Sequence, residues 1–313
     1  MLADDRPGHA AQALGVAEAL SEPFRVHRLG YRRLAALSAL LPRASLAGLD
    51  RGSRQALLPP WPRLVIAAGR RTAPVARWLK RRSGGTTRLV QLMDPGDWRD
   101  LDLVAIPAHD APRPDPRVVA TLGAPHRLHA ETLRRAARVW TAQVARLPRP
   151  RIAVLVGGRS PHARWTPGWA RVLAAEVEAL AAARGGSLML TTSRRTPEDA
   201  VSALERDGGA VPVWRHLYGT PGENPYAGML ALADAVVVTA DSVSMLTEAC
   251  AAGRQVYAFG KDVVAGSKLA RLLDALEADG RVLPLGAAWS DRSFVPLRPQ
   301  DDIAREIRSR QLV

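Results

Sequence analysis

Two domains of the doubly wound α/β class are predicted by three features of the sequence. Short apolar runs alternate with stretches of helical periodicity along most of the chain, which is typical of parallel sheets built from βαβ units. The chain has 313 residues, which is too long for one ordinary core and sufficient for two. The alternation stops at Pro148-Arg149-Pro150 and restarts at once, which predicts a domain boundary near residue 150.

The first half carries three predicted strands and two predicted helices. The strands cover 62–69, 86–94 and 101–110, and the helices cover 72–82 and 131–147. Only Met1 to Asp4 precede the loop 5–9, so the strand that should open a doubly wound domain is either very short or incomplete here. The predicted first domain is residues 1–148.

The second half repeats the pattern more regularly. Strands are predicted over 151–160, 187–195, 210–216, 235–240 and 255–260, and helices over 168–184, 196–208 and 224–233, with one more that starts near Ser242. The predicted second domain is residues 149–290. The tail 291–313 contains a predicted surface helix over 301–312, which we expect to pack back across the domain junction.

Composition indicates a soluble globular protein. Hydrophobic residues make up 47% of the chain and charged residues 24%, and no apolar run reaches 18 residues, so no transmembrane helix is expected. The first residues lack the apolar stretch of a signal peptide. The single cysteine, Cys250, excludes an internal disulfide and fits a reducing, cytoplasmic location; we expect it to be a small buried apolar residue.

The positive charge is concentrated in the first half. Residues 1–150 carry 25 Lys and Arg against 12 Asp and Glu, whereas residues 151–313 carry 19 against 18. Such a field favours an anionic partner. Aromatic residues are only 5% and no nucleic-acid-binding motif is present, which disfavours nucleic acid. The basic segments 29–43 and 70–82 predict peripheral docking on an anionic inner membrane, or else solvated arginines over core-facing leucines.

Three strand ends in the second half carry residues suited to phosphate. Ligands of open parallel sheets bind beyond the carboxyl ends of the strands, where we find a glycine turn, two adjacent guanidinium groups and a helix N-terminus. These residues are Gly157, Gly158, Arg159 and Ser160; Ser193, Arg194 and Arg195; and Asp241, Ser242 and Ser244. Each set alone also fits a plain turn, solvated charges or a helix N-cap. Their coincidence at one sheet edge predicts a diphosphate site.

Glu248 lies on the same predicted helix face as Asp241 and Ser244. Carboxylates in nucleotide sites accept hydrogen bonds from ribose hydroxyls, so Glu248 is the predicted ribose contact. The alternative is an exposed helix glutamate without a role.

These segments resemble a known family. The matching stretches are DRPGHAAQALGVAEAL, PAHD, GAPHRL, VGGRSP, TSRRTP, NPYAGMLALADAVVVTADSVSMLTEA and the strand that follows it, scattered over residues 5–260. Together they are similar to the ELM1 family, named for a plant mitochondrial fission factor and widespread in bacteria as candidate glycosyltransferases. The last stretch also resembles the donor segment of GT-B glycosyltransferases, notably the lipid-linked N-acetylglucosaminyltransferase of peptidoglycan synthesis.

The resemblance implies a GT-B-like fold, with two Rossmann-type domains that face a central cleft, and glycosyl transfer from a nucleotide-sugar to a glycan or lipid-linked acceptor. The nucleotide-sugar is a co-substrate, and no separate cofactor is expected. The donor would bind the second domain and the acceptor the first, where His9, then Asp94 and Asp110, are the candidate general bases of an inverting reaction. His9 also fits a structural role at a helix end.

No metal is expected. Asp100-Leu101-Asp102 matches the D-x-D pattern of metal-dependent transferases, but it precedes a predicted strand instead of following one. Two other functions stay open: an epimerase of nucleotide-sugars on the same frame, and a noncatalytic adaptor that keeps the fold and recruits partners to a membrane.

Overall fold

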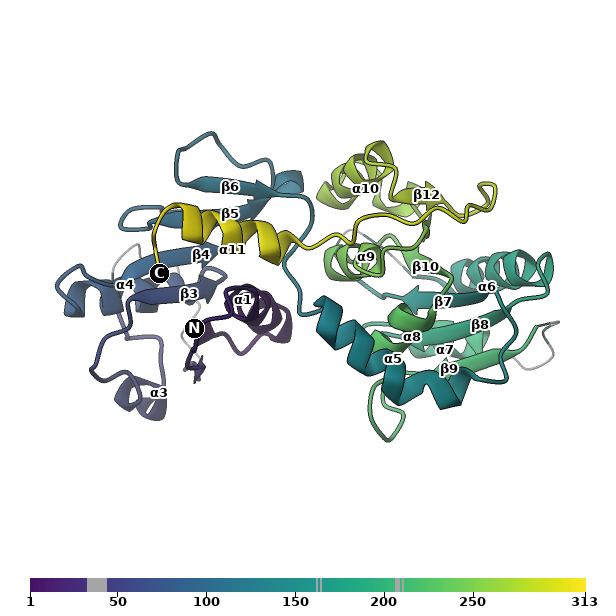
Figure 1. The fold of residues 1–313 in the computed structure, drawn as a ribbon, viewed down its shortest axis with the longest axis horizontal. Helices are drawn as coiled ribbons and strands as arrows, with labels where there is room; N and C mark the ends of the chain where they lie inside the picture. The colour runs from purple at the N-terminus through teal and green to yellow at the C-terminus, as the bar shows by residue number, and fades with distance from the viewer. Residues whose placement is uncertain (33–43, 162, 164, 206–208, 210) are drawn as a thin grey trace. The chain divides into compact units, whose positions relative to one another are not determined.

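The computed structural model describes residues 1–32, 44–161, 163, 165–205, 209 and 211–313. They form two compact units, Met1–Arg127 together with Arg298–Val313, and Leu128–Leu297 (Figure 1). Each unit contains a parallel β-sheet with helices packed on it. The predicted α/β class with two parallel-sheet domains is therefore confirmed.

The first unit contains a four-stranded parallel sheet in the order β3-β4-β5-β6 and a separate parallel pair β1-β2. Its elements are β1 (Leu2–Ala3), α1 (Pro7–Ala19), β2 (His27–Arg28), α3 (Arg51–Gln55), β3 (Leu64–Ala68), α4 (Ala73–Arg82), β4 (Arg88–Leu92), β5 (Leu103–Pro107), the 3₁₀ turn η1 (Ala108–Asp110), β6 (Val118–Thr121) and α11 (Pro299–Ser309). The opening strand β1 is only two residues long, and both residues are buried.

The strands of the first unit are buried on both faces because alternate side chains point in opposite directions. Ile66 and Ala68 pack with α1 and α11, whereas Val65 and Ala67 pack with α4. This explains why 62–69 reads as a continuous apolar run. The two helical layers hold β3 rigidly, so the residues that follow its carboxyl end start from a defined position.

The second unit has a six-stranded parallel sheet in the order β12-β11-β10-β7-β8-β9. Its elements are α5 (Ala130–Val144), β7 (Arg151–Val156), α6 (Pro167–Ala182), β8 (Ser187–Thr192), α7 (Glu198–Leu204), β9 (Val213–His216), α8 (Tyr226–Leu232), β10 (Ala235–Thr239), α9 (Val243–Cys250), β11 (Val256–Phe259), the 3₁₀ turn η2 (Asp262–Val264), α10 (Lys268–Ala278) and β12 (Val282–Pro284).

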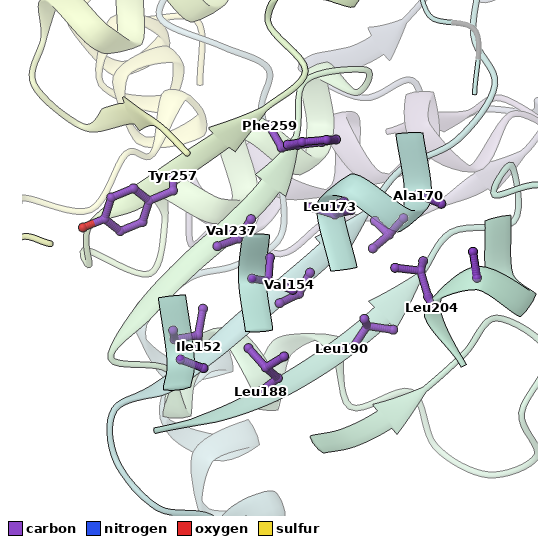
Figure 2. Close-up of a cluster of buried hydrophobic side chains, with 14 of the residues drawn as sticks. Ile152, Val154, Ala170, Leu173, Leu188, Leu190, Leu204, Val237, Tyr257 and Phe259 are labelled. Atoms are coloured by element: carbon purple, nitrogen blue, oxygen red, sulfur yellow. The ribbon is translucent and has the colours of Figure 1, made fainter. Parts of the chain in front are cut away.

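One face of this sheet packs on α6 and α7. Ile152, Val154 and Val237 meet Leu173 of α6 and Leu204 of α7 in a single buried cluster, drawn in Figure 2. The chain runs outward from β7 to β8 and β9, and then returns to the other side of β7 with β10. The strand order therefore reverses between β7 and β10, which is the position where open parallel sheets bind ligands.

The division of the chain differs from the predicted boundary at residue 148. The helix α5 belongs to the second unit, where it packs on α8: a Cβ added at Gly228 would lie 2.4 Å from Cδ1 of Trp140. The end of the chain returns to the first unit, where Ile303 and Ile307 of α11 are fully buried beside α1. The amphipathic face of α11 is thus part of a core and not a surface feature.

Candidate functional site

The glycine turn after β7 is anchored to the end of β10. The amide of Gly157 donates to Oγ1 of Thr239 at 2.8 Å, and the amide of Gly158 donates to Oδ2 of Asp241 at 2.6 Å. A Cβ on Gly157 would lie 2.1 Å from Asp241 Oδ2, and one on Gly158 would lie 2.1 Å from the backbone of Arg195. The three predicted segments therefore meet at the topological switch point, and they approach so closely that only glycine fits.

The turn after β8 is locked onto the same glycines. Arg159 N donates to Arg195 O at 3.0 Å, and Ser193 N donates to Thr196 Oγ1 at 2.9 Å. The Thr196 hydroxyl in turn donates to Gly157 O. The helix predicted over 196–208 begins at Glu198 and has no side-chain cap, and the Thr196 hydroxyl joins the two turns instead.

Three arginine side chains project from these locked turns. Arg159, Arg194 and Arg195 are exposed. Among the salt bridges of the described residues none involves these three guanidinium groups. Unpaired guanidinium groups on a rigid turn suit a diphosphate, because each can bind two phosphate oxygens without first breaking an ion pair.

The amides of the glycine turn have a different role from the predicted one. Sequence reasoning expected them to donate to an anion, but those of Gly157, Gly158 and Arg159 donate to protein oxygens, and Ser160 N donates to Ala163 O at 3.2 Å. The glycines therefore serve close packing. The positive charge at this edge comes from the arginines and from the N-terminus of α9.

Asp241 faces the protein and not the solvent. Its side chain is buried, Oδ2 receives the Gly158 amide, and Oδ1 has no hydrogen-bond partner among the described residues. Burial raises the pKa of Asp241, while its hydrogen bonds with Thr239 and Gly158 and the charge of Arg195 oppose that rise. A carboxylate repels phosphate, so this geometry indicates an anchor for the turn.

The two serines of the segment differ in environment. Ser242 is buried and caps α9, since its hydroxyl accepts from Met245 N at 3.4 Å. Ser244 lies in the first turn of α9 and is exposed. Of the two, only Ser244 has a hydroxyl that could contact a ligand without giving up a capping bond.

Glu248 lies one turn further along α9 and is partly exposed. Its Oε2 accepts a hydrogen bond from the hydroxyl of Tyr226 on α8 at 2.8 Å. Burial raises the pKa of Glu248 to about 7, and the Tyr226 bond acts in the opposite direction. This carboxylate is held in place on one oxygen and has the second available.

In the first unit, His9 is paired with a buried carboxylate. His9 Nδ1 lies 2.8 Å from Asp4 Oδ2, and the Asp4 side chain is 1% exposed against 17% for His9. Arg71 binds Asp5 through both terminal nitrogens at 2.8 and 3.0 Å and stacks 3.7 Å above the Tyr31 ring. Burial disfavours the charge on Asp4, but the His9 hydrogen bond and the nearby Arg71 outweigh it, so the pKa of Asp4 lies well below its usual range.

The three candidate bases have different surroundings. His9 lies against the end of β3, because a Cβ on Gly69 would be 2.5 Å from His9 Nδ1. Asp94 follows β4, is exposed, and accepts a 2.7 Å hydrogen bond from Nε1 of Trp98 within its own loop. Asp110 ends the 3₁₀ turn after β5 and is half-buried. Of the three, His9 has the orienting carboxylate that a general base needs.

The D-x-D segment supports the sheet of the first unit. Asp102 Oδ2 accepts from Lys80 Nζ and from Leu89 N, both at 2.7 Å. The described residues contain no group of three His, Cys, Asp or Glu side chains placed to hold a metal ion.

The basic segment 70–82 uses part of its charge internally. Arg77 is 3% exposed and donates to the carbonyl oxygens of Asp97 and Arg99, and Lys80 pairs with Asp102. This favours the structural interpretation for the inner face of α4. Residues 33–43 of the other basic segment lie outside the described residues. Among those that are described, no helix is both long and apolar enough to cross a membrane.

Sequence reasoning missed two partners of the site, Asp4 and Tyr226. Asp4 directly follows β1, and Tyr226 begins α8 within the NPYAG segment. Their places at the end of a strand and at the start of a helix are the signals that could have identified them as site residues. Their roles depend on contacts to His9 and Glu248 that no local pattern indicates.

The sequence of the chain is similar to one protein family and to two known proteins. The family described as Mitochondrial fission ELM1 matches residues 7–311. The mitochondrial fission protein ELM1 of Arabidopsis thaliana is 30% identical over 294 residues, which cover 85% of this chain and 67% of the relative. An uncharacterized protein of Rickettsia prowazekii (strain Madrid E) is 26% identical over 296 residues, covering 83% and 82%.

Solved structures share the fold at low identity. UDP-GlcNAc 2-epimerase of Methanocaldococcus jannaschii matches with a TM-score of 0.53 and 12% identity over 98% of each chain. The Neisseria meningitidis 2-epimerase bound to UDP-GlcNAc matches with 0.50 and 12% identity over 99% of this chain and 91% of that one. The glycotransferase of kitacinnamycin matches with 0.50 and 14% identity over 100% and 92%. The fold is thus the one shared by GT-B glycosyltransferases and these epimerases.

Proposed function

The chain belongs to the Mitochondrial fission ELM1 family, and we propose that it is a GT-B-type glycosyltransferase whose second unit binds a nucleotide-sugar. The observation that carries this proposal is the convergence of 157–160, 193–196 and 241–244 at the switch point between β7 and β10. That position is where parallel α/β sheets bind nucleotides. The unpaired arginines there supply the positive charge that a diphosphate leaving group requires.

Each part of the donor has a proposed partner. The diphosphate binds Arg159, Arg194 and Arg195, with the N-terminus of α9 and the Ser244 hydroxyl beside it. The ribose hydroxyls donate to the Glu248 carboxylate. A likeness in fold to a 2-epimerase bound to UDP-GlcNAc supports a sugar nucleotide as the ligand class.

His9 is the proposed general base for an acceptor hydroxyl in an inverting reaction. The hydrogen bond from Nδ1 to Asp4 leaves Nε2 to accept the proton, and the Asp4 carboxylate stabilises the imidazolium that results. The acceptor is proposed to be a glycan or a lipid-linked glycan.

Binding calorimetry tests the donor site. We would titrate UDP, GDP, ADP, CMP and dTDP, with and without attached sugars, into wild type, Glu248→Ala and the control Glu198→Ala, which removes an exposed glutamate of α7. Loss of a hydrogen bond to a charged group costs roughly 1.5–3 kcal/mol, so Glu248→Ala should weaken the bound nucleotide roughly 10- to 100-fold. Absence of binding by every nucleotide would refute the proposal.

Two other functions have specific support. Epimerisation is favoured by the fold shared with UDP-GlcNAc 2-epimerases, and formation of a 2-epimer from UDP-GlcNAc without any acceptor would establish it. An adaptor role is favoured by the name of the Arabidopsis relative, a mitochondrial fission protein. A chain that binds no nucleotide but retains its fold would support the adaptor.

A further inference from the structure

The segment Asn224-Pro225-Tyr226 sets the start of α8. Asn224 Oδ1 accepts from the Tyr226 amide at 3.0 Å, and Pro225 occupies the N-cap with φ of −79°. An Asn side chain that closes a turn on the backbone two residues later restricts the chain before the helix begins. Tyr226 is therefore placed by local geometry at the first helical position.

Packing further along α8 prevents the helix from sliding. Gly228, Met229 and Leu230 are buried, and the close approach of Gly228 to the Trp140 indole leaves no space for a side chain. Gly228 lies two residues after Tyr226 and faces the opposite side of α8, so its contact with α5 fixes the helix and not the phenol ring itself. The turn before the helix and this helix contact together fix the backbone from which the Tyr226 side chain extends.

The Tyr226 phenol is hydrogen-bonded to Glu248. The two residues are 22 positions apart, and the Tyr226 hydroxyl donates to Oε2 at 2.8 Å. Among the hydrogen bonds of the described residues, this is the one that the Glu248 side chain makes. The hydroxyl has a single proton, and giving it to Oε2 leaves Oε1 as the acceptor for another donor.

We propose that Tyr226 is a positioning residue that directs Glu248 Oε1 toward the 2′-hydroxyl of a bound nucleoside diphosphate, and that it thereby determines selection of ribonucleotides over 2′-deoxyribonucleotides. This inference rests on the proposed function, since it assigns a partner to the same donor site. A carboxylate held on one oxygen loses less freedom when the ribose binds, which increases the difference between a ligand with the hydroxyl and one without it.

The protonation state of Glu248 gives a second readout. The pKa of about 7 means that acid removes the ionised acceptor near neutrality, so affinity should fall as the pH falls through 7. β10 has no titratable side chain, and Tyr257 of β11 uses its hydroxyl on the backbone of Ala288 and Ser290. Asp241 precedes α9 and uses its carboxylate to bind the Gly158 amide. Cys250 on α9 stays protonated because burial raises its pKa to about 12.

The test compares UDP with 2′-deoxy-UDP, or the matching pair for whichever base the chain prefers, across pH 5.5–8.5. For wild type we expect at least 10-fold tighter binding of the ribonucleotide at pH 8. Tyr226→Phe should reduce this ratio below about 3 and move the pH midpoint of binding upward, because the bond that favours ionised Glu248 is lost. Glu248→Gln should abolish the ratio and its dependence on pH; the terminal phosphate, with a second pKa of about 6, titrates alike in both ligands and cancels in the ratio.

Tyr218→Phe is the matched control, because this tyrosine of the same unit is 63% exposed. Tyr218→Phe should leave the affinity ratio and the pH midpoint of binding unchanged. If Tyr226→Phe binds with the wild-type ratio and midpoint, the inference fails and the proposed function stands. If wild type binds no nucleotide, both fail.

A folding defect in Tyr226→Phe would appear in circular dichroism. Asn224→Ala then makes the same test, because it loosens the turn and keeps the hydroxyl. An unchanged ribose preference in Asn224→Ala and Tyr226→Phe alike would overturn the positioning role.

Discussion

Replacing Gly158 by alanine tests the convergence of the three turns directly. The added Cβ would lie 2.1 Å from the carbonyl carbon and oxygen of Arg195 and 2.4 Å from Thr196 N. Ordinary carbon contacts begin near 3.4 Å, so one backbone segment has to move by more than about 1 Å. Both are tied to strand ends by hydrogen bonds, so the displacement cannot be confined to a loop.

The cost has two sources. Inserting a carbon into a packed site costs about 1–3 kcal/mol. Moving the turn also weakens the bond from Gly158 N to Asp241, and the loss of a hydrogen bond to a buried carboxylate costs about 1.5 kcal/mol or more. We expect Gly158→Ala to lower the unfolding free energy of the second unit by about 2–4 kcal/mol, or its melting temperature by about 5–15 °C.

Differential scanning calorimetry would measure this change, with nucleotide binding as a second readout. Gly168→Ala is the control: Gly168 lies in the first turn of α6, and its Cβ would meet nothing closer than 3.8 Å. The control should melt at or slightly above the wild-type temperature. A Gly158→Ala protein that melts within about 2 °C of wild type would refute the close approach and the site built on it.

Three further predictions concern the two units. Ile303→Ala removes a fully buried side chain of α11 and should destabilise the first unit by about 2–5 kcal/mol in urea unfolding. Asp4→Asn should lower the melting temperature at neutral pH, because the lowered pKa of Asp4 stabilises the folded state when the carboxyl is ionised. The difference in melting temperature between Asp4→Asn and wild type should become smaller below pH 3.8, where acid removes this stabilisation. Glu248 binds a proton in the folded state between pH 4.5 and 7 that the unfolded chain has lost, so stability should fall as pH rises through this range. Glu248→Gln should reduce the fall in melting temperature between pH 4.5 and 7. A melting temperature that falls with pH as steeply as in wild type would contradict the raised pKa of Glu248.

Local sequence patterns located most strands and helices because they depend on neighbouring residues. The runs at 62–69 and 151–156 are buried on both faces and therefore read as continuous apolar stretches. Short elements were not predicted, such as β2, which has two residues and no apolar one, and β6, which has four residues. The ligand edge could be predicted as well, since parallel strands bring their carboxyl ends together whatever the loops contain.

Local sequence patterns did not predict the unit to which each helix belongs. Pro148 and Pro150 end α5 locally, but the packing of Trp140 on Gly228 assigns this helix to the second unit. The helix over 301–312 was predicted at the surface, and no local pattern indicated that α1 would cover the face of α11 that carries Ile303 and Ile307. Hydrophobic periodicity specifies that a face is buried, and not which surface buries it.

The sequence alone determined the parallel-sheet class, the strand ends and the kinds of side chain gathered there, because these follow from periodicity and from residue chemistry. Tertiary structure decided what each of those side chains does. Asp241 anchors a turn, and Glu248 is oriented by Tyr226, through hydrogen bonds between segments separated by many residues. Such bonds depend on distances of a few tenths of an ångström between packed elements, and no local pattern encodes them.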